Sequence, residues 1–153
     1  MDLWERSVIS KDKVWLYERD ELNPLYTHGD INYLFDLPEL AVRRYGDYNI
    51  LFSHYLHPNL TGSEQVFYHD PHEFITHKDF MKKMNAQISF TGHRHYPGLM
   101  VNSEKSIINR NFGRNYTVKE GDIVHVPAIT RANNNSGFMI FDDQSMSAQV
   151  FKI

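Results

Sequence analysis

Two short apolar runs, each followed directly by histidine, flank a predicted helix and constrain the fold more than any other feature. Residues 48–53 (YNILFS) are rich in β-forming side chains and lead straight into His54. Residues 88–91 (ISFT) form a second buried run, which is followed by Gly-His-Arg-His at 92–95. Between them, residues 72–86 carry apolar side chains at helical spacing opposite a lysine face. This order predicts a crossover unit of two parallel strands joined by an amphipathic helix.

The rest of the chain predicts further strands. Leu40 and Val42 alternate with polar residues ahead of the turn signal Gly46-Asp47, so residues 40–53 are predicted to form a hairpin. After Gly98, short β-type runs are separated by turn-like clusters, and the last two runs predict a hairpin around DDQS. Residues 1–32 are polar and irregular, with a possible helix at 12–23. The sequence therefore predicts an α/β sheet with few helices and a β-rich C-terminal half.

Composition narrows the classes of function. The 153 residues suit one domain, and the net charge of −3 comes without a basic block, so nucleic acid or an anionic membrane surface is not indicated as a partner. No apolar run has the length of a membrane helix, and the charged N-terminus does not resemble a signal peptide. The absence of cysteine excludes thiolate metal sites and, with these features, predicts a cytoplasmic protein.

Histidine is the residue type that stands out, because most of the 9 histidines lie between residues 54 and 95. Ligands of open α/β sheets collect at the carboxyl ends of the strands, where His54, His93 and His95 are expected to meet. Two histidines separated by one residue in a turn can each face a different ion, as in two-metal hydrolytic sites. Gly92 is expected to allow the close approach of the backbone there.

Three segments together resemble the C-terminal half of the calcineurin-like metallophosphoesterases, nearest to the small bacterial and archaeal phosphodiesterases. They are NILFSHYLHP at 49–58, ISFTGHRHYPG at 88–98 and VHVPAITRANNNSGFMIFDD at 124–143. The resemblance covers about residues 33–153, and residues 1–32 form a separate irregular or helical segment. It implies an αββα sandwich, a β-sandwich with flanking helices, of which this chain holds only the C-terminal half.

The resemblance also implies a metal-dependent hydrolase acting on a phosphomonoester or phosphodiester. His54 and His93 correspond to ligands of one metal and His95 to a ligand of the other. Mn is the first expectation for the metal ions, with Fe, Zn or Ni as alternatives. Arg131 is expected to point its guanidinium at a phosphate, and His57 is a candidate substrate contact or else a solvated loop residue. No catalytic residue is assigned.

The elements missing from the pattern are as informative as those present. The family's N-terminal half supplies an Asp-x-His pair, a Gly-Asp whose carboxylate bridges both metals, and a Gly-Asn-His turn, and none occurs at the corresponding place here. Gly29-Asp30 lacks an upstream apolar strand and is interpreted as a coincidence. Asn59, Asp70 and the histidines at 57, 69 and 72 are the neighbouring groups that could substitute, but no spacing requires it.

A half-fold has two consequences. One apolar sheet face is expected to be exposed, which predicts a homo-oligomer or a complex with a complementary N-terminal half. It also leaves open whether this chain is active by itself. A non-catalytic remnant that serves as a binding or scaffold module is the alternative, and a mononuclear three-histidine site is a third possibility.

The remaining histidines have simpler interpretations. His69 and His72 lie in a loop that is expected to border the site, where His72 can cap or be solvated at the helix start. His77 falls on the apolar stripe of the predicted helix and is expected to pack in the core. His125 alternates within a strand and is expected to be structural.

Overall fold

The computed structural model describes residues 36–62, 66–103, 106–129 and 136–153, together with Thr27, Gly29, Asp30, Tyr33 and Glu64. The helix expected at 12–23 and the candidate residue Arg131 lie outside these described residues. Among the described residues, no helix is both long enough and apolar enough to cross a membrane.

The predicted hairpin and crossover are both confirmed. Strands β1 (Leu40–Tyr45) and β2 (Tyr48–Ser53) pair antiparallel around Gly46-Asp47. The chain then crosses through the 3-10 turn η3 (Pro71–Phe74) and helix α3 (Ile75–Lys83) to β3 (Ile88–Thr91), which pairs parallel with β2. The helix is shorter than the predicted 72–86 because its first turn is 3-10.

Side chains at both ends of this helical segment account for its limits. The side chain of Asp70 accepts a hydrogen bond from the backbone N–H of His72, and Glu73 Oε2 accepts from the N–H of Asp70 at 2.7 Å. This reciprocal capping box satisfies backbone donors that the first turn leaves unpaired. At the other end, Asn85 adopts a left-handed conformation with φ of 52°, which ends the helix.

Two sheets of different size stack on each other. The large sheet has six strands in the order β1-β2-β3-β7-β4-β5, and the small sheet has three in the order β6-β9-β8. The additional strands of the large sheet are β4 (Leu99–Asn102), β5 (Ile107–Arg110) and β7 (Ile123–His125). Those of the small sheet are β6 (Asn115–Thr117), β8 (Gly137–Asp142) and β9 (Ser147–Lys152), with β8 and β9 in the predicted hairpin around DDQS.

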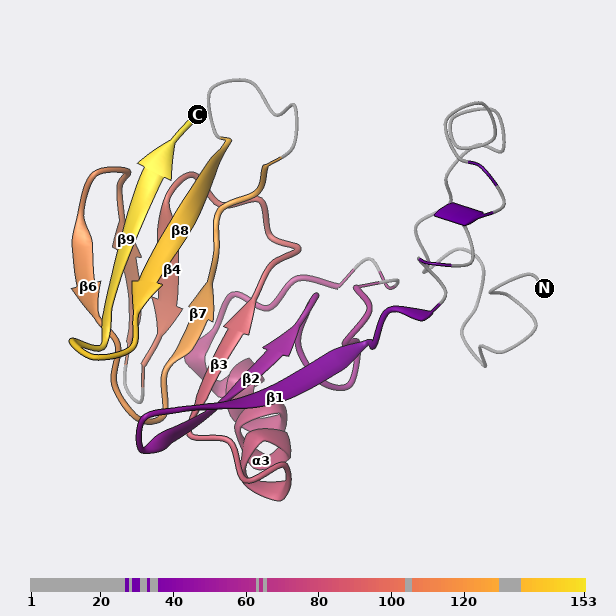
Figure 1. Ribbon diagram of the computed structural model, residues 1–153. Helices are drawn as coiled ribbons and strands as arrows, with labels where there is room; N and C mark the ends of the chain where they lie inside the picture. Colours follow the sequence, from indigo (N-terminus) through magenta and orange to yellow (C-terminus); the bar gives the residue numbers. More distant parts are fainter. Residues whose placement is uncertain are drawn as a thin grey trace.

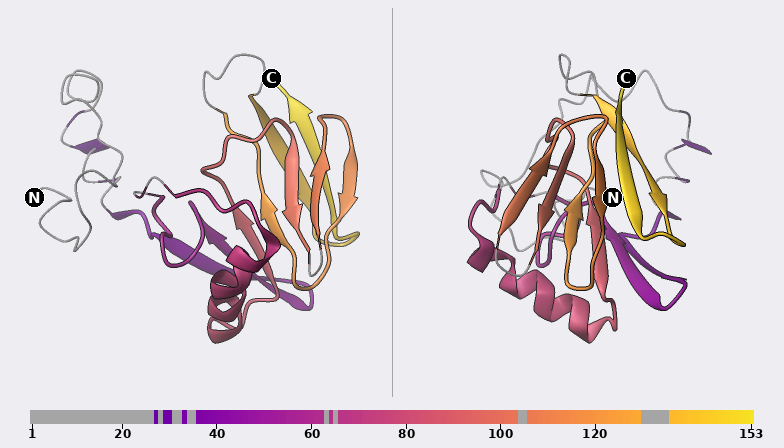
Figure 2. Two further views of the ribbon diagram at one scale, coloured as in Figure 1. Left: turned by 180° about the vertical axis from the view of Figure 1, so that it is seen from behind. Right: turned by 90° about the vertical axis from the view of Figure 1, so that its left-hand side faces the viewer.

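The described elements form three layers. Figures 1 and 2 show α3 on one side of the large sheet and strands β6, β9 and β8 on the other. The core between the sheets contains Ile50, Phe90, Val101 and Val124 from the large sheet and Val150 from the small one, all buried. Burial of such side chains is the main stabilising contribution to a fold of this kind.

This packing corrects one expectation. The apolar face of the large sheet was predicted to be exposed, but the small sheet of the same chain covers much of it, as the T-shaped contact between Phe90 of β3 and Phe141 of β8 illustrates. The prediction is wrong for β3, β4 and β7, because the strands after Gly98 return onto this face as a second layer. At β1 and the carboxyl end of β2 the face still lines an apolar hollow.

Helix α3 covers the opposite face of the large sheet. Phe74 and Met81 are buried against Leu51 and Ile123. The described residues thus form a mixed α/β fold in which strands predominate and one short helix packs on a multi-strand sheet.

Candidate metal centre at the strand ends

The parallel pairing of β2 and β3 places their carboxyl ends side by side. Ser53 pairs with Thr91, so the residues that follow each strand are neighbours. The carbonyl oxygen of His54 accepts hydrogen bonds from the N–H of Gly92 at 2.9 Å and from Thr91 Oγ1 at 3.2 Å. These bonds fix His54 against the turn that carries His93.

The imidazoles of His54 and His93 face each other. Nε2 of His54 lies 3.1 Å from Nδ1 of His93, and the ring centroids are 5.1 Å apart in an edge-on arrangement. His95 lies close enough to influence both rings electrostatically. The described residues nevertheless contain no group of three or more His, Asp or Glu side chains that could hold a metal ion.

The turn that presents His93 and His95 has an unusual backbone. His93 has φ of 68° and His95 has φ of 47°, so both residues are in the left-handed region although neither is glycine. Such a conformation costs roughly 1–2 kcal/mol per residue. Backbone strain of this kind clusters at functional sites, and here it aims His93 at His54 rather than away along the strand.

Burial keeps the facing imidazoles uncharged at neutral pH. Burial, and then the proximity of His54 and His95, lower the pKa of His93 from 6.5 to about 4. The pKa of His54 is also lowered, first by burial and then by His95. A neutral imidazole keeps a lone pair available for a metal ion. Nε2 of His93 is itself buried without a hydrogen-bond partner.

Residues that the sequence did not single out enclose His93. The ring of Tyr55 lies 4.5 Å from the His93 ring between centroids, and Phe67 stacks on it at 5.2 Å. A Cβ atom added to Gly62, which has φ of +67°, would lie 2.5 Å from His93 Nδ1 and 2.7 Å from His54 Cδ2. At Gly92 the same atom would stand 3.5 Å from the His54 carbonyl oxygen. Gly62 rather than Gly92 is therefore the glycine that the close approach requires.

The other side chains considered as oxygen ligands have structural partners. The Asn59 amide accepts from the N–H of Glu64 at 3.2 Å and donates to its carbonyl oxygen at 3.1 Å. Asp70 caps the helical segment. Asp30 Oδ2 accepts from both Thr27 N and Thr27 Oγ1.

His57 points away from the facing pair. Its ring stacks on Phe80 of α3 at 4.3 Å with an interplanar angle of 5°, and its backbone N–H donates to His77 Nδ1 at 2.9 Å. The structure does not bring His57 to His54 and His93, because the chain turns towards the helix after Leu56. The expected substrate contact by His57 therefore has no geometric support.

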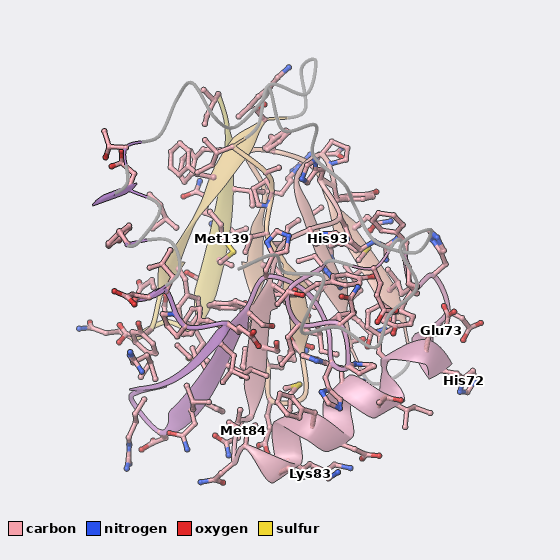
Figure 3. All side chains as sticks on the ribbon, turned by 90° about the vertical axis from the view of Figure 1, so that its right-hand side faces the viewer. His72, Glu73, Lys83, Met84, His93 and Met139 are labelled. Carbon is pink, nitrogen blue, oxygen red and sulfur yellow. The ribbon has the colours of Figure 1, made fainter. Side chains whose placement is uncertain are left out.

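His69 and His72 lie in the segment leading into the helix, as expected, but only His69 is connected to the turn. His69 Nδ1 lies 3.1 Å from Arg94 Nη2, and Arg94 also donates to the carbonyl oxygen of Tyr68. Arg94 thereby holds the 67–69 segment against the turn. His72 is exposed at the start of the helical segment, and Figure 3 shows it apart from His93.

His77 and His125 are buried, as expected. His77 Nδ1 accepts from the N–H of His57, so Nε2 carries the proton and donates to Ser89 Oγ at 2.9 Å. His125 is fully buried beside Phe74, and neither of its ring nitrogens has a hydrogen-bond partner. Burial is the main cause that lowers the pKa of His125 to about 3.

A pocket of about 590 Å³ opens next to His54. Its walls come from the ends of β1, β2 and β3, from Val126 after β7 and from Met139 of β8. Figure 3 shows Met139 and His93 in the same half of the molecule, away from Lys83 and Met84 at the end of α3. The sequence did not predict this pocket.

Comparison with known proteins bears on the fold alone. No protein-family model and no curated protein matches the chain. Among solved structures, it is similar to the hypothetical protein PH1004 from Pyrococcus horikoshii OT3, with a TM-score of 0.55 at 15% identity. The match covers 82% of this chain and 44% of that protein, so the chain spans less than half of its structural neighbour.

Proposed function

We propose that this chain is the C-terminal half of a calcineurin-like, metal-dependent phosphoesterase, a hydrolase of phosphomonoesters or phosphodiesters. The observation that carries the proposal is the pair of uncharged imidazoles, His54 and His93, which face each other across 3.1 Å at the carboxyl ends of two parallel strands. The αββα architecture of that family is also part of this proposal. The described residues supply one helix and two stacked sheets of it.

The pair suits one divalent ion. With metal–nitrogen bonds of about 2.1 Å, two donors of one ion stand about 3.1 Å apart when their angle at the metal is roughly 95°. Imidazole nitrogen is compatible with Mn, Fe, Zn and Ni, and Mn is the ion that we propose first. Two neutral ligands do not neutralise a divalent charge, so further ligands have to complete the site.

Each residue has a distinct role in this proposal. In this proposal His54 and His93 hold one ion, and His95, on the same turn, contributes to a second. When bound, the metal ions activate water and stabilise the charge on the phosphoryl oxygens. Hydrolysis forms a bond from the water oxygen to phosphorus, breaks the ester P–O bond and leaves the alcohol oxygen to take up a proton. Arg131 is retained as a candidate phosphate contact, whereas His57 is not.

The missing carboxylates point to a complementary polypeptide. This chain corresponds to 44% of its structural neighbour, which supports the idea that a second segment completes the fold and the metal site. A homo-oligomer is the other proposed association, for which the exposed Phe138 and Ile140 on the outer side of β8 offer an apolar surface.

The alternative is a non-catalytic binding module that keeps a remnant of the metal site. The observation that favours it is the lack of any group of three or more potential ligands among the described residues. Metal binding and hydrolysis therefore need to be measured separately.

The test is calorimetric titration of the purified chain with Mn²⁺, together with assays on 4-nitrophenyl phosphate and bis(4-nitrophenyl) phosphate. We expect His54→Ala and His93→Ala each to weaken Mn²⁺ binding at least tenfold, or about 1.4 kcal/mol. The matched control is His72→Ala, because His72 is an exposed histidine outside the pair. Binding that is absent, or equal in all variants, overturns the metal site. Binding at the pair without hydrolysis of either ester excludes catalysis by this chain alone, a result that both the non-catalytic module and a half that needs its complement predict.

A further inference from the structure

The pocket beside His54 exists because the two sheets differ in width. The small sheet ends at β8, which lies over β3 through the contact of Phe141 with Phe90, whereas the large sheet continues to β2 and β1. Beyond the β8 edge, the inner side of β1 and of the carboxyl end of β2 lines a hollow, whereas Ile50 in the middle of β2 is buried. The resulting hollow reaches from Met139 of β8 to Ala41 of β1.

The interior of this pocket is apolar. Its lining includes Leu40, Ala41, Phe52, Phe90, Val126 and Met139. The rings of Phe52 and Phe90 meet edge to face at 5.6 Å. Phe90 is almost fully buried, so the half-buried Phe52 offers the aromatic surface of the pocket. The volume of about 590 Å³ falls in the range of pockets for small organic ligands.

Charge and position define how a ligand can be oriented. Among the described residues, no lysine or arginine lines the pocket, and Glu39 is the one acidic residue there. An anionic group is therefore not stabilised inside the pocket, whereas uncharged apolar surface is. His54 lies in the wall and simultaneously faces His93, so the pocket borders the proposed metal site directly.

We propose that the pocket binds the apolar, aromatic alcohol portion of a phosphoester, with the phosphate directed to His54 and His93. The inference rests on the proposed function, because it assigns a substrate class to the same site. Aryl phosphoesters are then preferred over phosphoesters of small polar alcohols, since only the former bury apolar surface against Phe52 and Phe90.

The pocket can be tested without turnover. The full chain with ¹³C-methyl methionine is titrated with 1-naphthol in the absence of metal. We expect the methyl signal of Met139, in the pocket, to shift, and that of Met81, buried under α3, to remain unchanged. Ala41→Trp fills the pocket and should weaken naphthol binding roughly tenfold or more. Ile75→Trp adds an indole at an exposed position on α3 and should leave it unchanged.

Ala41→Leu is the second variant in case the tryptophan disturbs the fold. Its smaller side chain occupies less of the pocket, and it should also weaken naphthol binding. The proposal is overturned if the Met139 signal does not shift, which is also the result expected if a polypeptide already fills the pocket. It is equally overturned if wild type, Ala41→Leu and Ile75→Trp bind naphthol with the same affinity. Turnover then separates the two proposals. With Mn²⁺, Ala41→Trp should lower kcat/KM for 1-naphthyl phosphate at least tenfold and leave kcat/KM for glycerol phosphate unchanged. An equal effect of the substitution on both esters removes the pocket's role but keeps the phosphoesterase. Naphthol binding at Met139 without any hydrolysis keeps the pocket and removes catalysis by this chain alone.

Discussion

Acidification should weaken this fold through His77, whose ring is 1% exposed between α3 and the large sheet. Burial, and then His57, lower the pKa of His77 from 6.5 to about 4. Between these two values the unfolded chain binds a proton that the folded protein excludes, so the free energy of unfolding rises with pH in this window. The contribution is complete above pH 6.5 and lost as the pH falls through 4.

The magnitude follows from the two pKa values. One pKa unit corresponds to about 1.4 kcal/mol, so the difference between 6.5 and about 4 amounts to roughly 3 kcal/mol. At pH 5, about 2 kcal/mol of this has already been lost. His77→Phe removes the titrating group but keeps a ring in the core. At pH 7.5 it should be less stable by about 2–4 kcal/mol, because the N–H of His57 and the hydroxyl of Ser89 lose their partner.

The assay is urea unfolding followed by far-UV circular dichroism at pH 7.5, 6 and 5. The stability gap between the wild type and His77→Phe should narrow by about 2 kcal/mol from pH 7.5 to pH 5. Ser89→Ala is the control: it removes one hydrogen bond and leaves the imidazole, so its gap should change little with pH. A gap for His77→Phe that stays constant over this range would refute the reasoning.

Two further substitutions test the site and the core. Gly62→Ala should displace His93 and destabilise the fold by more than the roughly 1 kcal/mol expected of Gly46→Ala. Both glycines have positive φ, but of the two added Cβ atoms only that at 62 meets a side chain. Equal unfolding free energies of the two variants, with an unchanged NMR signal of the His93 imidazole, would contradict the close packing of Gly62 against His93. Tyr116→Phe should cost about 1–3 kcal/mol in urea unfolding, because it removes the 2.9 Å hydrogen bond to the buried carboxyl of Asp122; a stability within experimental error of wild type would argue against that bond.

Local sequence signals were sufficient for the elements that depend on neighbours along the chain. The alternation at Leu40 and Val42 with the turn at Gly46 identified the β1–β2 hairpin. The apolar stripe of residues 72–86 identified the helical crossover, although not its 3-10 first turn. These patterns succeed because side-chain periodicity and turn chemistry report directly on which face of an element is buried.

The candidate site was predictable in part for the same reason. Residues that end parallel strands must lie at one edge of the sheet, which is how His54 and His93 could be expected together. The fate of His57 could not be anticipated, since its stacking on Phe80 depends on where the loop after β2 meets the helix. The contacts of Gly62 and Phe67 with His93 could not be anticipated either, because both residues are far from the turn along the chain.

The amino-acid order by itself determined which segments are strands and helix and which histidines follow strand ends, because these properties depend on a few adjacent residues. Only the tertiary structure decided that the small sheet returns over the large one, that it stops at β8, and that a pocket remains beside His54. Those outcomes depend on how far each sheet extends over the other. The width of a sheet is set by pairing between strands that are distant in sequence, and these strands meet only when the chain is folded.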